Sequence, residues 1–446
     1  MLREAWTLAI ETLSWIELKR LGERLALNRA TKQLRIKDRK AIGLAHRLVS
    51  ETLRRKNHID FLLNSVLTPR SLNDFKLGAR AFLRLYVYET KLADGNLENA
   101  VKIAKMGRSI LGWRELEDAE EVLGEILSVN PESALQGLDE VEKVGLQTYH
   151  PAWFVKYCFR LLGRAEALKF LEISAEIPPV YVRLNTLKAP QETLLKKLED
   201  EQIVLEKVQQ LKHTYRLVEN RKPLIRTQGF SQGLFYIQDK ASCLAAEIAN
   251  PKPDTTVLDV CAAPGAKTTY LAQLMENRGT IISVDYSTRR IRVWKRETAR
   301  MGANISQPLV ADARKSLPLN VSADLVILDP PCTSTGTFGK TPGAKWRLTK
   351  RSMLGMAKIQ AEMIEQCAEY VKRGGFLVYS TCSITVEENE TVIENFLKLH
   401  PEFKLMDTKP KIGLPGLRGL TKCQRLYPHV HECNGFFVAK LKKENT

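Results

Sequence analysis

Short apolar runs alternate with helix-forming stretches over residues 251–443, and this alternation constrains the fold more than any other feature of the sequence. Runs of this kind are typical of strands buried on both faces of a parallel sheet, with helices as the crossovers. The pattern therefore predicts an α/β fold with a doubly wound, mixed sheet. The expected strands are 257–260, 280–285, 307–311, 325–329 and 376–381, and the run 435–441 is expected to be an edge strand.

Two regions with different patterns precede the alternating region. Residues 1–145 lack strand-like runs and carry apolar residues at helical spacing, as in the stripe from Ile42 to Val49, which predicts an all-helical domain. Residues 146–250 combine short strand-like runs with a short helix, which predicts a small α+β domain. A chain of 446 residues is long enough for these two domains and a third at 251–443.

The composition indicates the kind of partner and the compartment. The net charge of +17 favours a polyanionic partner such as a nucleic acid, although the same Lys and Arg residues could simply solvate the surface. The eight cysteines form no CxxC pair, which fits free thiols in a reducing compartment. Glu4 and Glu11 interrupt the first apolar residues, and no run of about 18 apolar residues occurs. We therefore expect neither a signal peptide nor a membrane span, and a cytoplasmic location.

Two cysteines directly follow two of the expected strands. Cys332 ends an Asp-Pro-Pro-Cys motif, and Cys382 lies in a Ser-Thr-Cys-Ser motif. Neighbouring parallel strands deliver their carboxyl ends to the same edge of a sheet, so the two thiols could meet in one pocket. A single cysteine is usually an inert buried side chain, but such a pair suits a nucleophile and a second group that helps to break its covalent bond.

A turn of small residues and three acids mark the same edge of the expected sheet. The turn 261–267 joins the first strand to a helix, and its N–H groups could bind an anion, although a tight structural connection explains it equally well. It matches neither the dinucleotide fingerprint nor the P-loop. Asp285, Asp312 and Asp329 end or follow three successive strands. One such acid is usually a cap, but three at consecutive strand ends indicate a ligand site.

In combination, these motifs resemble the signature set of the RsmB/NSUN family of RNA cytosine-C5 methyltransferases. The resemblance covers nearly the whole chain and is carried by the run 257–267, the segment 329–336 and the motif around Cys382. The helical region resembles the NusB-like RNA-binding domain of the RsmB branch. Ala266 replaces a glycine that most members carry, and the turn tolerates alanine if its φ is negative. Further matches are 238–242, 345–347 and 435–437, and Asn434 stands where an Asp is usual.

The resemblance implies a Rossmann-like class I methyltransferase domain that uses S-adenosylmethionine to form 5-methylcytidine in RNA. In the family the nucleophile is the cysteine of the Thr-Cys motif, here Cys382, which adds to C6 of the cytosine. Cys332 would assist loss of the C5 proton and release of Cys382. Asp329 would hydrogen-bond N3 and the amino group of the base, and Lys267 would support Asp329 and the reactive thiol. We also expect a helix beginning near Val386 to favour the Cys382 thiolate.

The same resemblance implies a methyl-donor site around the turn of small residues. Asp285 would hold the ribose hydroxyls, and Asp312 would accept a hydrogen bond from the adenine amino group. The residues implied to surround S-adenosylmethionine are Cys261, Ala262, Ala263, Pro264, Gly265, Ala266, Lys267, Asp285, Arg290, Asp312 and Asp329.

Other substrates and another class of function compete with this interpretation. The NusB-like region favours small-subunit ribosomal RNA, and transfer RNA stays open because related enzymes with similar catalytic domains use it. A DNA cytosine-C5 methyltransferase would place its nucleophile in the Pro-Cys motif, so the Thr-Cys motif argues against that class. A non-catalytic RNA-binding or ribosome-assembly factor would be expected to lose Cys382 or Asp329, and both are present.

Two smaller groups of residues could have other roles, namely metal binding and base stacking. Two cysteines and two histidines within 423–433 fit no standard zinc spacing, and we expect no metal. Trp346 could stack on a flipped base while Lys345 and Arg347 bind phosphates, or it could simply pack in a loop. We expect the protein to act as a monomer.

Overall fold

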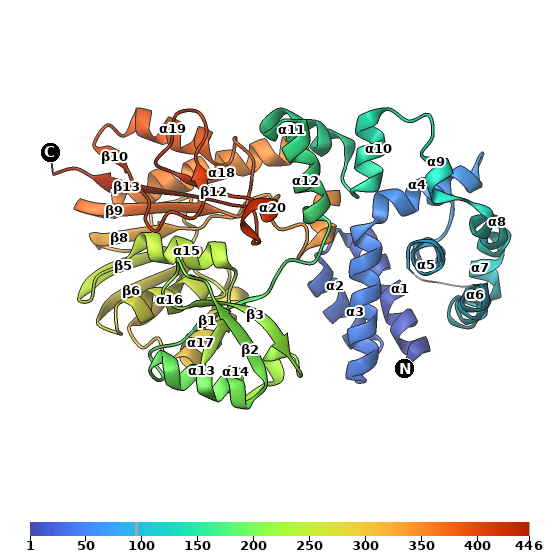
Figure 1. Ribbon diagram of the computed structural model, residues 1–446, viewed down its shortest axis with the longest axis horizontal. Helices are drawn as coiled ribbons and strands as arrows, with labels where there is room; N and C mark the ends of the chain where they lie inside the picture. The colour runs from blue at the N-terminus through green and yellow to red at the C-terminus, as the bar shows by residue number, and fades with distance from the viewer. Residues whose placement is uncertain (94–96, 446) are drawn as a thin grey trace. The chain divides into compact units, whose positions relative to one another are not determined.

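The structure is a computed structural model that describes residues 1–93 and 97–445. Its internal contacts divide the chain into a helical unit and a sheet unit, which Figure 1 shows as ribbons. Among the described residues, every helix is too short or too polar to span a lipid bilayer. The helical unit comprises Met1–Ile177 and Phe338–Arg347, and the sheet unit comprises Pro178–Thr337 and Leu348–Thr446.

Amphipathic helices pack around one apolar core in the helical unit. In α3 the buried residues Ala41, Ala45, Leu48 and Val49 recur at helical spacing, and the small alanines allow the close packing of α3 on α1. The all-helical region expected from the sequence is therefore confirmed. Its helices are α1 (Leu2–Lys19), α2 (Glu23–Gln33), α3 (Arg39–Arg54), α4 (Lys56–Leu67), η1 (Leu72–Asp74), α5 (Leu77–Val87), η2 (Tyr88–Leu92), α6 (Leu97–Leu111), α7 (Trp113–Glu120), α8 (Leu123–Ser128), α9 (Pro131–Ala134), α10 (Glu140–Gln147), α11 (Ala152–Leu162) and α12 (Arg164–Ser174).

Two of these helices, α11 and α12, lie beyond residue 145 and still belong to the helical unit. Phe154 of α11 and Phe170 of α12 are fully buried, and their ring centroids are 6.4 Å apart. Their aromatic packing therefore extends the helical unit past the expected start of the α+β domain. The division into the domains 1–145, 146–250 and 251–443 stays a prediction.

The segment Phe338–Arg347, which contains η4 (Pro342–Trp346), packs within the helical unit although its chain neighbours belong to the sheet unit. The ring of Phe338 lies edge-on to Phe154, with centroids 5.2 Å apart. Trp346 donates a hydrogen bond from Nε1 to the Leu53 carbonyl at 2.5 Å, so the packing alternative for this side chain is supported. Lys345 is only 1% exposed, so its burial argues against the alternative in which it binds phosphate.

An antiparallel sheet of order β2-β3-β1-β4 opens the sheet unit and matches the expected α+β region. Arg183 of β1 is fully buried and donates to Gln238 Oε1 at 2.9 Å and to Thr269 Oγ1 at 2.8 Å. Its guanidinium therefore ties this small sheet to α16 (Ala266–Leu274) of the second sheet's region. The elements are β1 (Tyr181–Leu184), α13 (Gln191–Asp200), β2 (Ile203–Lys207), β3 (Thr214–Asn220), η3 (Leu224–Arg226), α14 (Gln228–Ser231) and β4 (Phe235–Ile237).

The second sheet has the order β11-β12-β13-β9-β8-β5-β6-β7, and β10 pairs with β13. Strands β7, β6, β5, β8 and β9 are parallel, and β13 runs antiparallel to β9. Its elements are α15 (Lys240–Ala249), β5 (Thr255–Val260), α16 (Ala266–Leu274), β6 (Gly279–Asp285), α17 (Thr288–Met301), β7 (Ser306–Val310), β8 (Ala323–Leu328), α18 (Lys350–Glu369), β9 (Val371–Thr381), α19 (Glu390–Leu399), β10 (Phe403–Met406), β11 (Leu414–Pro415), β12 (Gln424–Leu426), α20 (Pro428–His431) and β13 (Phe436–Lys443).

The inner parallel strands such as β8 are buried on both faces, as their apolar runs predicted, whereas β7 at the edge of the parallel strands is partly exposed. In β8, Val326 and Leu328 join a core with α18 and α19, whereas Leu325 and Ile327 join a core with α15 and α16. Successive side chains of a strand point to opposite faces, so helices must cover both sides of the sheet. This arrangement confirms the predicted doubly wound α/β fold.

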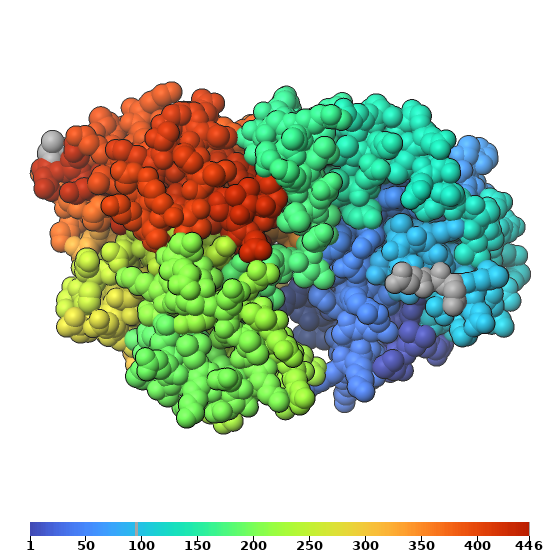
Figure 2. All heavy atoms as spheres, viewed as in Figure 1, coloured from blue at the N-terminus to red at the C-terminus, as the bar shows by residue number. Residues whose placement is uncertain are grey.

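The last strand, β13, is not at the edge of the sheet, and that expectation is wrong. It pairs with β9 on one side and with β12 and β10 on the other. Phe437, Val438 and Ala439 are all fully buried, so both edges and both faces of the strand need partners. Lys440 donates to the Ile248 carbonyl of α15 at 2.8 Å, and Figure 2 shows the yellow-green surface around α15 directly beside the red C-terminal strands.

Candidate active site

The turn after β5 brings the start of α16 to the edge of the sheet. Gly265, between Val260 and α16, has a φ of 107°, a left-handed conformation that glycine adopts without strain. A Cβ atom at this position would lie 3.3 Å from Cδ1 of Trp294, so the turn also benefits from the missing side chain. Ala266 is the first residue of α16 and has no positive φ, which meets the condition under which alanine replaces glycine here.

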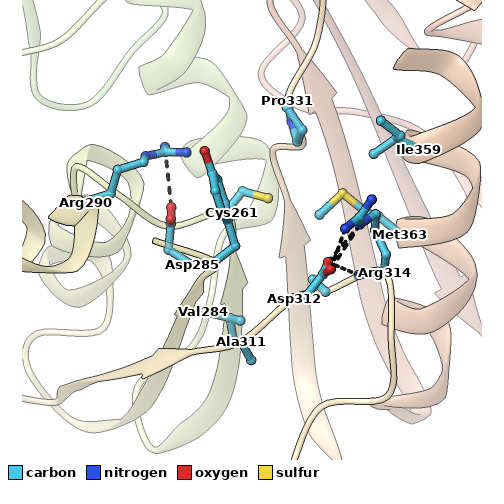
Figure 3. A pocket seen from close by; sticks show the side chains of 12 residues that line it. Cys261, Val284, Asp285, Arg290, Ala311, Asp312, Arg314, Pro331, Ile359 and Met363 are labelled. Atoms are coloured by element: carbon cyan, nitrogen blue, oxygen red, sulfur yellow. Dashed lines mark hydrogen bonds and ion pairs between the residues drawn. The ribbon is translucent and has the colours of Figure 1, made fainter. Parts of the chain in front are cut away.

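A cavity of about 220 Å³ opens beside this turn (Figure 3). Four of the residues predicted to surround the methyl donor line it, namely Cys261, Asp285, Arg290 and Asp312. The other residues predicted to surround the methyl donor, 262–267 and Asp329, are not among the described residues that line this cavity. The structure therefore brings the acids that end β6 and follow β7 around one cavity, at the carboxyl ends of parallel strands where open α/β sheets bind ligands.

The cavity lining also includes residues that the sequence did not indicate. Tyr286 and Arg314 lie one and two positions after the predicted acids Asp285 and Asp312, so proximity along the chain could have found them. Ile359 and Met363 lie four positions apart on one face of α18, and nothing in their apolar character distinguished them from core residues. The other lining residues are Val284, Ala311, Ala313 and Pro331.

The two acids of the cavity are held by cations and backbone N–H groups. Asp285, which is 2% exposed, accepts from Ala263 N at 3.3 Å and lies 3.4 Å from Nη2 of Arg290. Asp312 accepts from Nη2 of Arg314 at 2.6 Å and from Nε at 3.0 Å, and these hydrogen bonds lower the pKa of Asp312 to about 2. Asp312 therefore presents a charged carboxylate, an acceptor for hydroxyl or amino groups.

The two predicted thiols meet. Sγ of Cys332 lies 3.2 Å from Sγ of Cys382, and both cysteines are free and partly exposed. The hydrogen bond from Cys332 lowers the pKa of Cys382, aided by Ser334 and Lys267 and opposed by burial. The bond to Cys382 and burial raise the pKa of Cys332 well above that of an ordinary thiol. The two shifts have opposite directions, which favours the thiolate at Cys382 over a thiolate at Cys332.

Beside the thiols, Lys267 and Asp329 form an ion pair. Nζ of Lys267 lies 2.5 Å from Oδ2 of Asp329, and Ser380 donates from Oγ to Oδ1 of Asp329 at 3.2 Å. Burial disfavours the ammonium, but the Asp329 carboxylate raises the pKa of Lys267 above its ordinary value. The pair places a fixed acceptor and a buried positive charge next to Cys382.

The expectation that a helix N-terminus lowers the pKa of Cys382 is wrong. The helix α19 begins at Glu390, and a turn without regular helix covers 386–389. A helix dipole acts only within about the first turn, so α19 begins too far along the chain for the effect that we expected. The thiol, the hydroxyl and the ammonium described above lower this pKa instead.

In residues 1–93 and 97–445, no group of three or more His, Cys, Asp or Glu side chains is arranged to hold a metal ion. Within 423–433, Cys423 and Cys433 are each 1% exposed. Nδ1 of His431 lies 2.9 Å from the Tyr427 N–H and accepts its hydrogen bond. These three side chains belong to the local packing of the C-terminal strands.

Three family models match the chain in the order of its structural parts. NusB matches residues 3–106, the RsmF/B-like ferredoxin-like domain matches 150–222, and 16S rRNA methyltransferase RsmB/F matches 246–442. The chain is also 31% identical over 453 residues to the probable ribosomal RNA small subunit methyltransferase B of Bacillus subtilis, with 98% of each protein covered. The chain belongs to the RsmB/F methyltransferase family.

Two further comparisons agree with the assignment of this chain to the RsmB/F family. The tRNA (cytosine(72)-C(5))-methyltransferase of Pyrococcus horikoshii is 39% identical over 221 residues, which is 49% of this chain and 55% of the relative. The crystal structure of PH0851 covers 99% of both chains with a TM-score of 0.85 and 30% identity. The resemblance stated from the sequence and the predicted enzyme class, RNA (cytosine-C5)-methyltransferase, are confirmed.

Proposed function

We propose that this protein transfers a methyl group from S-adenosylmethionine to C5 of a cytidine in small-subunit ribosomal RNA, through a covalent bond between Cys382 and C6 of the base. The observation that carries the proposal is the 3.2 Å separation of the Cys332 and Cys382 sulfur atoms, with the pKa lowered at Cys382 and raised at Cys332. Two adjacent thiols whose pKa values are shifted in opposite directions suit a nucleophile and a group that assists its release.

The lining of the cavity beside the turn supports S-adenosylmethionine as the methyl donor. The carboxylate of Asp285 would accept hydrogen bonds from the ribose hydroxyls, and the charged carboxylate of Asp312 would accept one from the adenine amino group. Ile359 and Met363 would contact the adenine ring. When bound, S-adenosylmethionine supplies an electrophilic methyl group. The turn 261–267 would give the donor close access to the backbone because its side chains are small.

The side chains around Cys382 can carry the reaction at the base. Cytosine C5 is a poor nucleophile, and addition of the Cys382 thiolate to C6 turns the C5–C6 double bond into an enamine-like carbanion at C5. Asp329, held by Lys267, would accept a hydrogen bond from the amino group of the base, and one from N3 when N3 is protonated in the adduct. After methylation, a base takes the C5 proton, the electrons of the C5–H bond restore the C5–C6 double bond, and the S–C6 bond breaks with its electrons on the Cys382 sulfur. Cys332 would be that base, as a thiolate formed when its own proton has passed to solvent.

The choice of ribosomal RNA rests on the relatives that match the whole chain. The Bacillus subtilis relative, named for the small ribosomal subunit, covers 98% of this chain, whereas the Pyrococcus horikoshii tRNA enzyme matches 49% of it. The family models also place NusB and ferredoxin-like domains before the catalytic domain. Transfer RNA is the alternative substrate. That the protein acts as a cytoplasmic monomer stays a prediction.

The decisive experiment incubates the purified full chain and S-adenosylmethionine with unmethylated small-subunit ribosomal RNA or with unmethylated transfer RNA. Nucleoside mass spectrometry then measures 5-methylcytidine. We expect product on ribosomal RNA, a loss of at least about 1000-fold in Cys382→Ala, and near-normal product in Cys158→Ala, which removes a buried thiol of the helical unit. Product on transfer RNA alone would identify transfer RNA as the substrate instead. No product on either RNA would refute the proposed activity.

A further inference from the structure

The carboxylate of Glu388 lies between the two cysteine loops and is fully buried. Its Oε1 accepts hydrogen bonds from Thr333 N at 2.8 Å and from Gln360 Nε2 at 3.0 Å. Its Oε2 accepts from Ser383 Oγ at 2.6 Å, from Thr385 Oγ1 at 2.8 Å and from Thr333 Oγ1. A buried carboxylate is costly unless donors surround it, and here five contacts with donor groups meet that need.

All five of these donors are neutral, which distinguishes Glu388 from a nearby structural acid. Glu390, two positions later, is equally buried but pairs with the guanidinium of Arg425 at 2.5 Å. A cation next to a carboxylate cancels most of its field, whereas amide and hydroxyl donors leave the negative charge in place. Glu388 therefore stabilises its surroundings by hydrogen bonds and also acts on them electrostatically.

The hydrogen bonds of Glu388 join the two reactive loops. Thr333 directly follows Cys332, and Ser383 directly follows Cys382, so a single carboxylate holds the residue after each thiol. The hydroxyls of Thr333 and Ser383 also lie 3.3 Å apart. The separation of the two sulfur atoms consequently depends on the position of Glu388.

The Cys332 loop is fixed on its other side as well. Gln360 of α18 donates from Nε2 to the Pro331 carbonyl at 2.9 Å, in addition to its bond to Glu388. Cys332 thus lies between two residues that are anchored to one buried cluster. Besides the bond to Cys382 and burial, the charge of Glu388 raises the pKa of Cys332.

We propose that Glu388 is a positioning residue that holds the two cysteine loops in register and keeps the shared proton on Cys332, leaving Cys382 as the thiolate. This role deepens the proposed function, on which it rests. Charge and contact work together, because the same carboxylate sets the distance between the sulfur atoms and disfavours a second negative charge at Cys332. Two other charged groups act on Cys382: Lys267 of α16 lowers its pKa, and Asp329, which directly follows β8, raises it.

The test compares wild type with Glu388→Gln, which keeps the shape and removes the charge. Limited iodoacetamide labelling without RNA, followed by peptide mass spectrometry, measures the ratio of label at Cys382 to label at Cys332. We expect this ratio to fall about tenfold or more in Glu388→Gln. The kcat for methylation should fall about tenfold or more, whereas KM for S-adenosylmethionine should change less than about twofold. The matched control is Glu387→Gln, one residue away and partly exposed, which should leave both readouts unchanged.

Labelling and methylation separate the two proposals. A Glu388→Gln protein with the wild-type labelling ratio and the wild-type kcat would overturn the role of Glu388 while leaving the activity intact. Wild-type protein without methylation would refute the activity, and the labelling ratio would still decide the role of Glu388 on the thiols. If Glu388→Gln does not fold, Thr333→Val removes one hydroxyl contact while retaining the charge. It should lower kcat severalfold, and unchanged kcat with unchanged labelling would then reject the positioning role.

Discussion

Sγ of Cys332 lies 3.2 Å from Sγ of Cys382, although fifty positions of sequence separate them. The two residues follow β8 and β9, which are neighbouring parallel strands, so their carboxyl ends deliver both thiols to the same point of the sheet edge. At this distance the protonated sulfur donates to the other and lowers its pKa. The pair therefore has a built-in asymmetry before any substrate is present.

The asymmetry predicts different fates for the two alanine variants. Cys332→Ala should form the bond between Cys382 and RNA but release it slowly, because the group that assists release is missing. We expect a protein–RNA adduct that survives denaturing gel electrophoresis in the presence of S-adenosylmethionine. Cys382→Ala is the control and should form none. An adduct with Cys382→Ala instead would assign the nucleophile to Cys332.

The lowered pKa of Cys382 predicts a specific pH dependence of alkylation. The thiolate is the reactive form, so the rate rises with pH through the pKa and is constant above it. Because Cys332 lowers this pKa, the midpoint for Cys382 in wild type should lie below that of an ordinary thiol. In Cys332→Ala the midpoint should move to higher pH, as measured by iodoacetamide labelling of the Cys382 peptide. A midpoint that moves to lower pH would contradict the role of the hydrogen bond.

The Lys267–Asp329 pair predicts a loss of both activity and stability in Asp329→Asn. Lys267 is 8% exposed and would lose the carboxylate that balances its charge, keeping a contact of 3.4 Å with Oγ of Ser242, which should cost about 1–3 kcal/mol in the free energy of unfolding. Methylation should fall about 100-fold or more, because the acceptor for the base is altered. Urea unfolding and product formation measure the two effects. Glu98→Gln breaks an exposed pair with Lys102 and should leave unfolding unchanged.

The turn beside the cavity predicts unequal effects of two neighbouring substitutions. Gly265→Ala forces a side chain into a φ of 107° and towards Trp294, so we expect about 1–2 kcal/mol of destabilisation and weaker S-adenosylmethionine binding by calorimetry. Ala266→Gly changes a residue with helical backbone and should alter binding less than about twofold. Equal effects of both substitutions would show that the φ of Gly265 does not shape the donor site.

The positions of the thiols and acids could be predicted from the sequence because parallel strands impose them. Once the runs before Cys332 and Cys382 are recognised as neighbouring strands, both side chains must reach one edge. The same reasoning placed Asp285 and Asp312 together, and the cavity between them has that lining. Amphipathic spacing likewise predicted the helical region, since a stripe such as that of α3 needs an apolar core.

Only the tertiary structure decided which distant groups surround these residues. β13 occupies a position between β9 and β12, and Glu388 rather than a helix N-terminus anchors the loop after Cys382. A strand's neighbours and a buried acid's donors come from segments far apart in the chain, and their pairing depends on the whole packed sheet. Local periodicity thus determined the elements and the sheet edge where the two thiols lie, whereas the long-range contacts of the folded chain decided which groups hold each thiol and shift its pKa.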